Sequence, residues 1–316
     1  MKSTNFSDTK KIPAKLADEL KKRNLSNYKI ININPAKGRY NLLAVVEDRT
    51  PLFIKYNDPT GAGWNTFSKE KEIYHFMEGE KFIPKALHNE EILATVYIKG
   101  SCTLREWLLD NDDPQMFSCL IRNIVRQYQL FLRKLNDYSG KELRTLHADK
   151  ELNVFLGKLL TSGPYGSKIH KMEKIRNKCF HYFLRKKYAS RIKLSENTCV
   201  IHGDFHLNNI LVAEGKTYVI DLENIIRGNA AIELAYWYVQ VWVLVCNNKN
   251  LLPILEEEIK SIFDMELFDE KEFRMTVRLY QLAILLNRRF HRHEKRAGSK
   301  TIISKWLELN SPAAFY

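Results

Sequence analysis

Between residues 198 and 221, three side chains with carboxylate or amide oxygens lie close together in the sequence, near short apolar segments. The stretch VIHGDFHLNN, residues 200–209, carries Asp204 and, five positions later, Asn209, while Asp221 ends the next apolar segment. A carboxylate can orient an attacking hydroxyl group and accept its proton. Carboxylate and amide oxygens are also ligands that magnesium prefers. The set therefore predicts phosphoryl transfer, with Asp204 as the catalytic base and Asn209 and Asp221 as magnesium ligands.

The same residues also allow a purely structural interpretation, because Asp and Asn often shape turns and strand ends. An isolated His-Gly-Asp tripeptide would fit that interpretation. Here an apolar strand precedes the tripeptide, Asn209 follows Asp204 at the fifth place, and the next strand ends in Ile220-Asp221. The complete set favours the chemical interpretation.

This pattern resembles the aminoglycoside phosphotransferase and choline kinase-like family, whose catalytic loop has the form HGDxxxxN and whose metal-binding strand ends in Ile-Asp. His202, Gly203, Asp204 and Asn209 match the loop, and Asp221 matches the strand end. The resemblance covers roughly residues 30 to 240. It implies that His202 is a catalytic-loop residue beside Asp204 and Asn209, that ATP or GTP is the phosphate donor, and that Mg²⁺ is the metal.

The resemblance also implies a fold of the α+β class, the bilobal protein-kinase-like fold. We expect a small, β-rich, nucleotide-binding lobe over residues 1–98 and a larger, mainly helical lobe for catalysis and acceptor binding over 99–316. The apolar pattern agrees with this order. Strands are expected at 28–33, 41–47, 52–56, 85–88 and 92–98, with helices over 13–25 and 65–77. From residue 104 the pattern is mainly helical, with short strands at 198–201, 210–212 and 218–220.

Two charged residues of the first lobe match the nucleotide-binding positions of this family. Lys55 ends the apolar run Leu52-Phe53-Ile54 in the expected third strand, as the family's phosphate-binding lysine does. Its partner should be a glutamate of the following helix. Glu70 is the favoured candidate and Glu72 the competitor, while the bland alternative leaves both glutamates in solvent.

Three further residues are predicted to contact the nucleotide. Gly38 lies in the segment PAKGRYN, residues 35–41, and is the candidate glycine of the phosphate-covering loop, although an ordinary hairpin turn is the alternative. Tyr97 and Ile98 end the last strand of the first lobe, where backbone groups can meet an adenine edge. We therefore expect Gly38, Tyr97 and Ile98 in the cofactor-binding site.

The chain departs from the family's pattern after the metal-binding strand. Many members have Asp-Leu-Ala where this chain has Glu233-Leu234-Ala235. Glu233 is therefore not among the predicted site residues. His206, inside the catalytic loop, either contacts the acceptor or braces the loop by hydrogen bonds. The histidines of the triplet at 291–293 point to different faces of a helix, which disfavours a metal site there.

Composition limits the class of protein. The chain has 316 residues, of which 45% are hydrophobic, so it can form a sizeable core. Its five cysteines are scattered and never spaced as CxxC, which argues against a disulfide framework or a structural zinc site. The N-terminus lacks the apolar segment of a secretory signal. We expect a cytoplasmic protein without a transmembrane segment.

The acceptor is harder to infer. A net charge of +13, concentrated at 168–193 and 288–300, disfavours polycationic aminoglycosides. Choline would need an aromatic cage, which Tyr236, Trp237, Tyr238 and Trp242 could supply, although aromatic residues on a helix are more often core. The preferred class is a small-molecule, sugar or glycolipid acceptor, whose anionic groups the basic clusters could hold. The alternative is that these clusters are helix faces exposed to solvent, with no ligand.

Other functions are also considered. One is a catalytically inactive kinase fold, and another is a module whose basic helices bind nucleic acid. Lys55, Asp204, Asn209 and Asp221 are all present, which argues against an inactive enzyme. No RNA- or DNA-binding motif accompanies the basic clusters, so no specific nucleic acid is expected. Peripheral contact with a membrane surface is left open.

Overall fold

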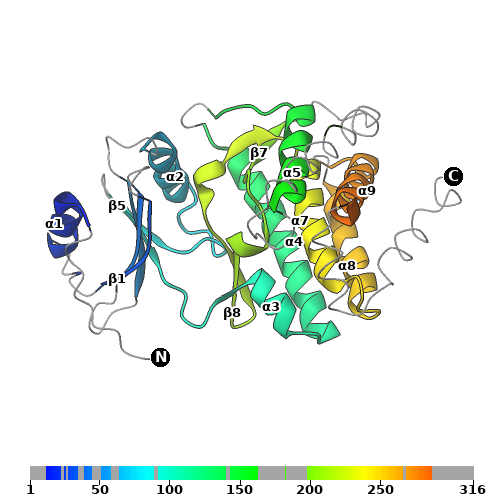
Figure 1. Ribbon diagram of the computed structural model, residues 1–316, viewed down its shortest axis with the longest axis horizontal. Coiled ribbons are helices and arrows are strands. Elements are labelled where there is room, and N and C mark those ends of the chain that lie inside the picture. The colour runs from blue at the N-terminus through cyan, green and yellow to red at the C-terminus, as the bar shows by residue number, and fades with distance from the viewer. Residues whose placement is uncertain are drawn as a thin grey trace, which may run out of the picture. The chain divides into compact units, whose positions relative to one another are not determined.

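The computed structural model describes most of the chain (Figure 1). The described residues are 12–22, 25, 28–34, 39–44, 51–57, 64–88, 92–139, 143–162, 182, 198–265 and 268–286. Gly38, the histidine triplet at 291–293, the cluster at 288–300 and all of the cluster at 168–193 except Tyr182 lie outside these residues. The chain divides into two compact units, 1–102 with 138–141 and 211–224, and 103–137 with 142–210 and 225–316.

The first unit is built on an antiparallel sheet of five strands in the order β1-β2-β3-β5-β4. Its elements are α1 (Ala14–Lys22), β1 (Tyr28–Asn34), β2 (Arg39–Ala44), β3 (Leu52–Asn57), α2 (Trp64–Phe76), β4 (Ala86–His88) and β5 (Ile92–Val96). Leu16 and Leu20 of α1 pack with Leu42, Ile54 and other buried residues of the sheet. Helix α1 is amphipathic and buries these two leucines, so it covers one face of the strands.

A second, smaller sheet contains the strand that leads to Asp221. Strands β6 (Cys102–Thr103), β8 (Ile210–Ala213) and β9 (Lys216–Val219) pair in the order β6-β8-β9, and the short helix η5 (Leu222–Asn224) follows β9. The backbone N–H of Val219 donates to the carbonyl of Phe82 at 2.8 Å. This bond fixes the end of β9 to the segment that follows α2.

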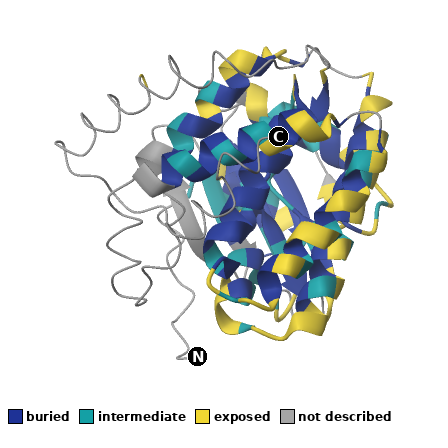
Figure 2. Ribbon diagram, turned by 90° about the vertical axis from the view of Figure 1, so that its right-hand side faces the viewer, coloured by how far each residue is buried: buried dark blue, intermediate teal, exposed yellow. Residues whose placement is uncertain are grey.

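The second unit is mainly helical. Its helices are α3 (Leu104–Asp110), α4 (Pro114–Asn136), α5 (Ala148–Ser162), α7 (Ala230–Val245), α8 (Leu251–Glu258) and α9 (Glu270–Leu286), with the 3₁₀ turns η4 (Leu207–Asn209) and η6 (Ile259–Asp264). Strands β7 (Cys199–Ile201) and β10 (Ile226–Gly228) form an antiparallel pair. Figure 2 shows the buried faces of these helices turned toward one another and the exposed faces outside.

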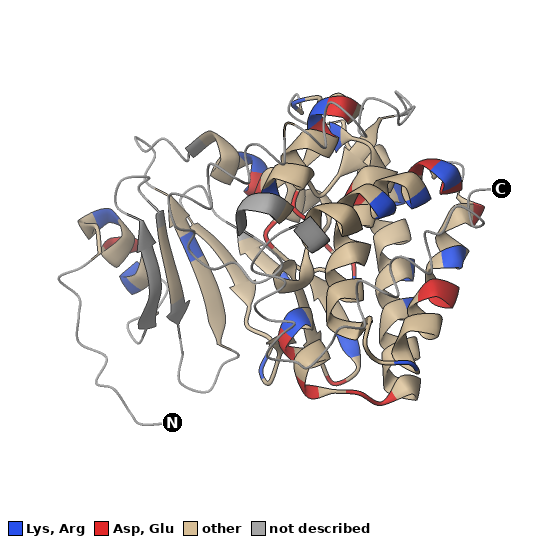
Figure 3. Ribbon diagram, turned by 45° about the vertical axis from the view of Figure 1, so that its right-hand side comes forward, with Lys and Arg blue, Asp and Glu red and all other residues tan. Residues whose placement is uncertain are grey.

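Helix α7 is the centre of this unit. All its residues except Leu244 are buried, and it packs against α9, α5, α3 and β7. Asn229 caps its N-terminus by accepting from the backbone N–H groups of Ala231 and Ile232. Every other described α-helix carries several charged residues, of both signs on most of them, although those of α4 are all basic and those of α8 all acidic (Figure 3). Helix α7 carries one charged residue, Glu233, and that residue is fully buried.

The expected class is confirmed, since the chain has an α+β fold with antiparallel sheets and a mainly helical remainder. The predicted strands and helices of the first unit agree with the observed ones to within a few residues. Among the helices that the structure describes, none combines the length and the apolar character that a membrane crossing requires.

Candidate active site

Lys55 lies between two carboxylates in the first unit. Its Nζ is 2.8 Å from Glu70 Oε1 and 2.5 Å from Asp221 Oδ1. Burial alone would lower the pKa of Lys55, but the charges of Glu70 and Asp221 outweigh it and raise the pKa well above its ordinary value. The lysine is therefore a fixed cation held from two sides, by a helix and by the end of β9.

Glu70 and Glu72 have different partners. Glu70 is 1% exposed and pairs with Lys55, whereas Glu72 accepts a hydrogen bond from the hydroxyl of Tyr138 at 2.6 Å. Burial raises the pKa of Glu70, although the charge of Lys55 opposes the rise. Of the two candidates, Glu70 is thus the glutamate that contacts Lys55.

Asp221 has an unusual backbone. Its φ is 65°, in the left-handed region that is uncommon for a residue with a side chain but tolerated by Asp and Asn. The carboxylate oxygens of Asp221, Glu70 and Glu223 include one from each residue that lie within 4.8 Å of one another. Sequence analysis did not single out Glu223. Its signal was its position two residues after Asp221.

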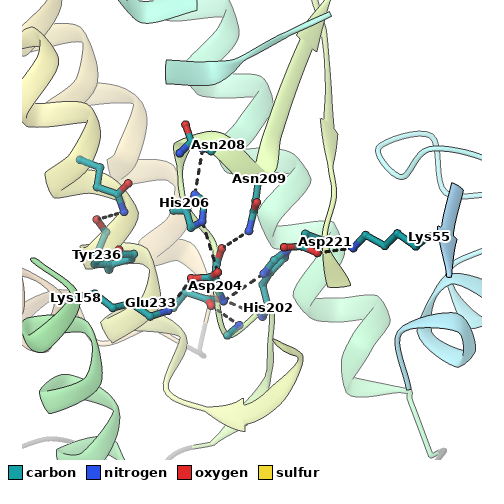
Figure 4. Close-up of polar contacts among 12 residues, drawn as sticks. Lys55, Lys158, His202, Asp204, His206, Asn208, Asn209, Asp221, Glu233 and Tyr236 are labelled. Atoms are coloured by element: carbon teal, nitrogen blue, oxygen red, sulfur yellow. Dashed lines mark hydrogen bonds and ion pairs between the residues drawn. The ribbon is translucent and has the colours of Figure 1, made fainter. Parts of the chain in front are cut away.

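The catalytic loop belongs to the second unit, and the carboxylate of its Asp204 has a lysine and a histidine as partners (Figure 4). Lys158 Nζ of helix α5 lies 2.6 Å from Asp204 Oδ1, and His206 Nε2 lies 3.5 Å from Oδ2. Burial would raise the pKa of Asp204, but the hydrogen bond from His206 and the charge of Lys158 outweigh it and lower the pKa below its usual range. Asp204 is therefore ionised at neutral pH.

His206 braces the loop, one of its two predicted alternatives. Its Nδ1 accepts from the backbone N–H of Asn208 at 3.1 Å, so we assign the ring proton to Nε2, which faces Asp204. Asn209 is also tied to the loop, because its Nδ2 donates to the Asp204 carbonyl at 3.0 Å. The amide oxygen of Asn209 is then the atom available to a metal ion.

His202 lies beneath the loop. It is 0% exposed, packs beside the rings of Phe131 and Phe205, and accepts at Nδ1 from the backbone N–H of Asp204 at 3.3 Å. A side chain so placed shapes the loop and cannot reach a substrate. Gly203, with φ of 77°, provides the left-handed turn that a side chain would strain.

Glu233, absent from the predicted site, holds the loop from behind. Its carboxylate accepts from the backbone N–H groups of His202 at 3.1 Å and Gly203 at 2.6 Å, and from the hydroxyl of Tyr128 at 2.7 Å. Burial raises the pKa of Glu233 to about 7, although these hydrogen bonds oppose the rise. One acidic residue in an otherwise uncharged, apolar helix was the signal in the sequence.

Tyr97 and Ile98, which are predicted to contact the nucleotide, each use one backbone group in a hydrogen bond within the protein. The N–H of Tyr97 donates to the Pro51 carbonyl at 2.8 Å, and the Ile98 carbonyl accepts from Ser101 at 3.2 Å. The Tyr97 carbonyl and the Ile98 N–H are therefore the backbone groups to consider for an adenine contact.

The four aromatic residues of α7 are all buried, two of them almost completely, with Trp237 at 0% and Trp242 at 1% exposed. This burial favours their interpretation as core.

Comparisons with known proteins concern the family and the fold. A family model described as the phosphotransferase enzyme family matches residues 47–249. No match to a curated protein was found. Among solved structures, an aminoglycoside phosphotransferase from Streptomyces rimosus is similar, with 13% identity, coverage of 86% of this chain and 97% of that one, and a TM-score of 0.55.

Two further solved structures are similar. The ternary complex of streptomycin, ATP and an aminoglycoside phosphotransferase has 15% identity, coverage of 87% and 88% of the two chains, and a TM-score of 0.52. The choline kinase LicA from Streptococcus pneumoniae has 16% identity, coverage of 96% and 100%, and a TM-score of 0.48. At these identities the likeness concerns the fold alone. The family model, which spans well over half of the sequence, identifies the chain as a member of the phosphotransferase enzyme family.

Proposed function

We propose that this chain transfers the γ-phosphate of ATP or GTP to a hydroxyl group of a small-molecule or sugar-containing acceptor. The observation that carries the proposal is the half-buried cation of Lys55, which is held by Glu70 and Asp221 at 2.8 and 2.5 Å. A fixed cation beside metal-binding oxygens is the arrangement that nucleotide phosphates require. In this proposal Lys55 binds the phosphates and Glu70 positions it.

The residues present fit a magnesium ion. In the first unit, carboxylate oxygens of Asp221, Glu70 and Glu223 lie within 4.8 Å of one another. In the second unit, the amide of Asn209, held by its bond to the Asp204 carbonyl, has a hard oxygen of the kind that magnesium prefers. We assign Asn209 and Asp221 as the magnesium ligands. When bound, the metal neutralises negative charge on the phosphate groups.

Asp204 acts on the acceptor. Because its pKa is low, it is a weak base, and its first contribution is to orient the attacking hydroxyl group. The proton passes to Asp204 late, as the acceptor oxygen bonds to phosphorus, which suits the loose transition state of phosphoryl transfer. His202, His206 and Glu233 keep the loop in place and do not touch the acceptor.

The first prediction tests this assignment by exchanging Asp204 for asparagine. The variant keeps the size of the side chain but loses the proton acceptor, so transfer from labelled ATP should fall by a factor of about 10² to 10⁴. A panel of sugars, choline, aminoglycosides and other hydroxyl-bearing metabolites serves as acceptors. Asp149→Asn, at an exposed aspartate of α5, is the matched control and should keep the wild-type rate. Normal transfer by Asp204→Asn would refute the assignment.

A further inference from the structure

Lys158 places a positive charge directly on the proposed base. Its ammonium group lies 2.6 Å from Asp204 Oδ1, and the two side chains are 34% and 21% exposed. Both groups therefore reach solvent, from which an acceptor must come. Any hydroxyl group that donates to this oxygen therefore lies beside the ammonium, because a carboxylate oxygen can accept from both.

Two aromatic rings support the ammonium group. Lys158 Nζ lies 5.0 Å from the ring centroid of Phe155 and 5.9 Å from that of Tyr236, and these rings stack at 4.7 Å. Aromatic faces attract cations. The carboxylate and the two rings together form a cation site, and the chain's own lysine fills it.

The other charged groups of the loop do not offset this cation. His206 donates to the second oxygen of Asp204, and the carboxylate of Glu233 is engaged by backbone N–H groups and Tyr128 on the buried side. Among the described residues, the side-chain partners of the Asp204 carboxylate thus include an ammonium and an imidazole N–H. The negative charge of Asp204 is compensated before any acceptor arrives.

We propose that Lys158 selects an acceptor that carries a phosphate or carboxylate group near its reactive hydroxyl, and discriminates against acceptors with an amine or quaternary ammonium there. This inference rests on the proposed function, because it takes Asp204 as the base. The ammonium has three N–H donors, so an anionic group on the acceptor gives it a second charge-assisted partner beside Asp204. A cationic group would meet a like charge and compete for the same rings.

The transfer step is unchanged in its chemistry. The acceptor O–H proton passes to Asp204, and the acceptor oxygen bonds to the γ-phosphorus. The bond from that phosphorus to the bridging oxygen breaks, and its electron pair leaves with the nucleoside diphosphate. Lys158 forms no covalent bond and acts by its charge alone.

The second prediction tests this inference with three sugars that share a ring and differ in charge: glucuronate, glucose and glucosamine. The wild-type protein should rank them in that order by kcat/KM with Mg·ATP, and by dissociation constant in the presence of Mg·ADP. Each step should be about tenfold, the scale of one charge-assisted hydrogen bond. Lys158→Glu should reverse the order, and Lys158→Gln should flatten it.

Lys150→Glu is the matched control, because it reverses a charge at an exposed position of the same helix. It should keep the wild-type order. A wild-type preference for glucose or glucosamine, or an unchanged order in Lys158→Glu, would overturn the inference. Magnesium-dependent ATP hydrolysis by the wild type without acceptor is the separate measure of the proposed function: if it is present while the order ignores charge, this inference alone fails.

Discussion

Among single residues, Glu70 and Glu72 of helix α2 have different partners and so different proposed roles. Glu70 contacts Lys55, and Glu72 contacts Tyr138. Residues two positions apart on a helix point to nearly opposite sides, so the two side chains cannot share a partner. Both contacts are hydrogen bonds to a carboxylate, so the same substitution at the two positions compares the importance of the two contacts.

The third prediction concerns this pair. Glu70→Gln removes the charge that holds Lys55, and kcat/KM for ATP should fall by about 10- to 100-fold, the scale of a charge-assisted hydrogen bond. Glu72→Gln should change it by less than about threefold, because the amide can still accept from Tyr138. Steady-state kinetics measures both. A larger loss in Glu72→Gln than in Glu70→Gln would mean that Glu70 does not position the lysine.

The residues that could be predicted lie within local sequence patterns, whereas Lys158, which was not predicted, does not. Lys55 lies in a strand, Glu70 in a helix and Asp221 just after a strand, at the places that the family's pattern predicts. The structure brings Lys55 into contact with the other two. The roles of these residues, and of Asn209 and Asp204, stay predictions. Lys158 stands 46 residues before Asp204, on a helix with one other lysine, Lys150. Only the tertiary fold brings it to the loop.

At the scale of elements, helix α7 stabilises the catalytic loop through one carboxylate. Glu233 is 0% exposed and accepts from two loop N–H groups and from Tyr128 of α4. Relative to the Asp-Leu-Ala expected from the resemblance, glutamate adds one methylene and still reaches the loop. Its position was uncertain from the sequence, because side-chain reach depends on the distance between helix and loop.

The fourth prediction is a pH dependence of stability. Burial raises the pKa of Glu233 from 4.5 to about 7. The folded protein therefore binds a proton between these values that the unfolded chain does not bind. The stabilising contribution of this group is complete below pH 4.5 and is lost as the pH rises through 7. It amounts to up to about 3 kcal/mol.

The free energy of unfolding of the wild type, minus that of Glu233→Gln, should therefore decrease between pH 5 and 8. Denaturant titration at each pH measures it. Glu257→Gln is the control, because Glu257 is 72% exposed, and its difference from wild type should stay flat. A flat difference for Glu233→Gln as well would show that Glu233 does not take up this proton on folding.

Elements were easier to predict than their pairing. Apolar, β-prone segments marked the strands of the first unit, and the apolar run at 230–246 marked a buried helix. The sheet order β1-β2-β3-β5-β4 brings β3 beside β5, with α2 and β4 between them in the chain. Such pairing depends on contacts far apart in sequence, which local patterns do not encode.

At the scale of the whole molecule, the chain forms two compact units, and residues 211–224, which include Asp221, group with the N-terminal residues. The pattern of predicted helices and strands did not indicate that residues 211–224 belong to the same unit as the N-terminal residues. The division at residue 98 and the cytoplasmic location stay predictions. The fold itself was implied by the short catalytic pattern, although identity to the similar solved structures is 13% and 15%.

The fifth prediction is that nucleotide stabilises this molecule only together with a divalent ion. At a concentration 100 times the dissociation constant, a ligand adds about 2.7 kcal/mol to stability, which raises Tm by several degrees. Mg·ATP should have this effect on the wild type, and ATP with a chelator should not. Asp221→Asn should lose most of it, whereas Glu72→Gln should keep it. An equal rise with the chelator would argue against the metal ligands assigned above.

The left-handed backbone of Asp221 limits how this position can evolve. Glycine would relax the backbone but remove the carboxylate, and glutamate would keep the charge but not adopt the conformation as readily. Aspartate satisfies both demands, so selection for the proposed metal binding and selection for folding act on one codon. In a descendant released from the first demand, only the second would remain, and glycine or asparagine at this codon would record the loss of that proposed role.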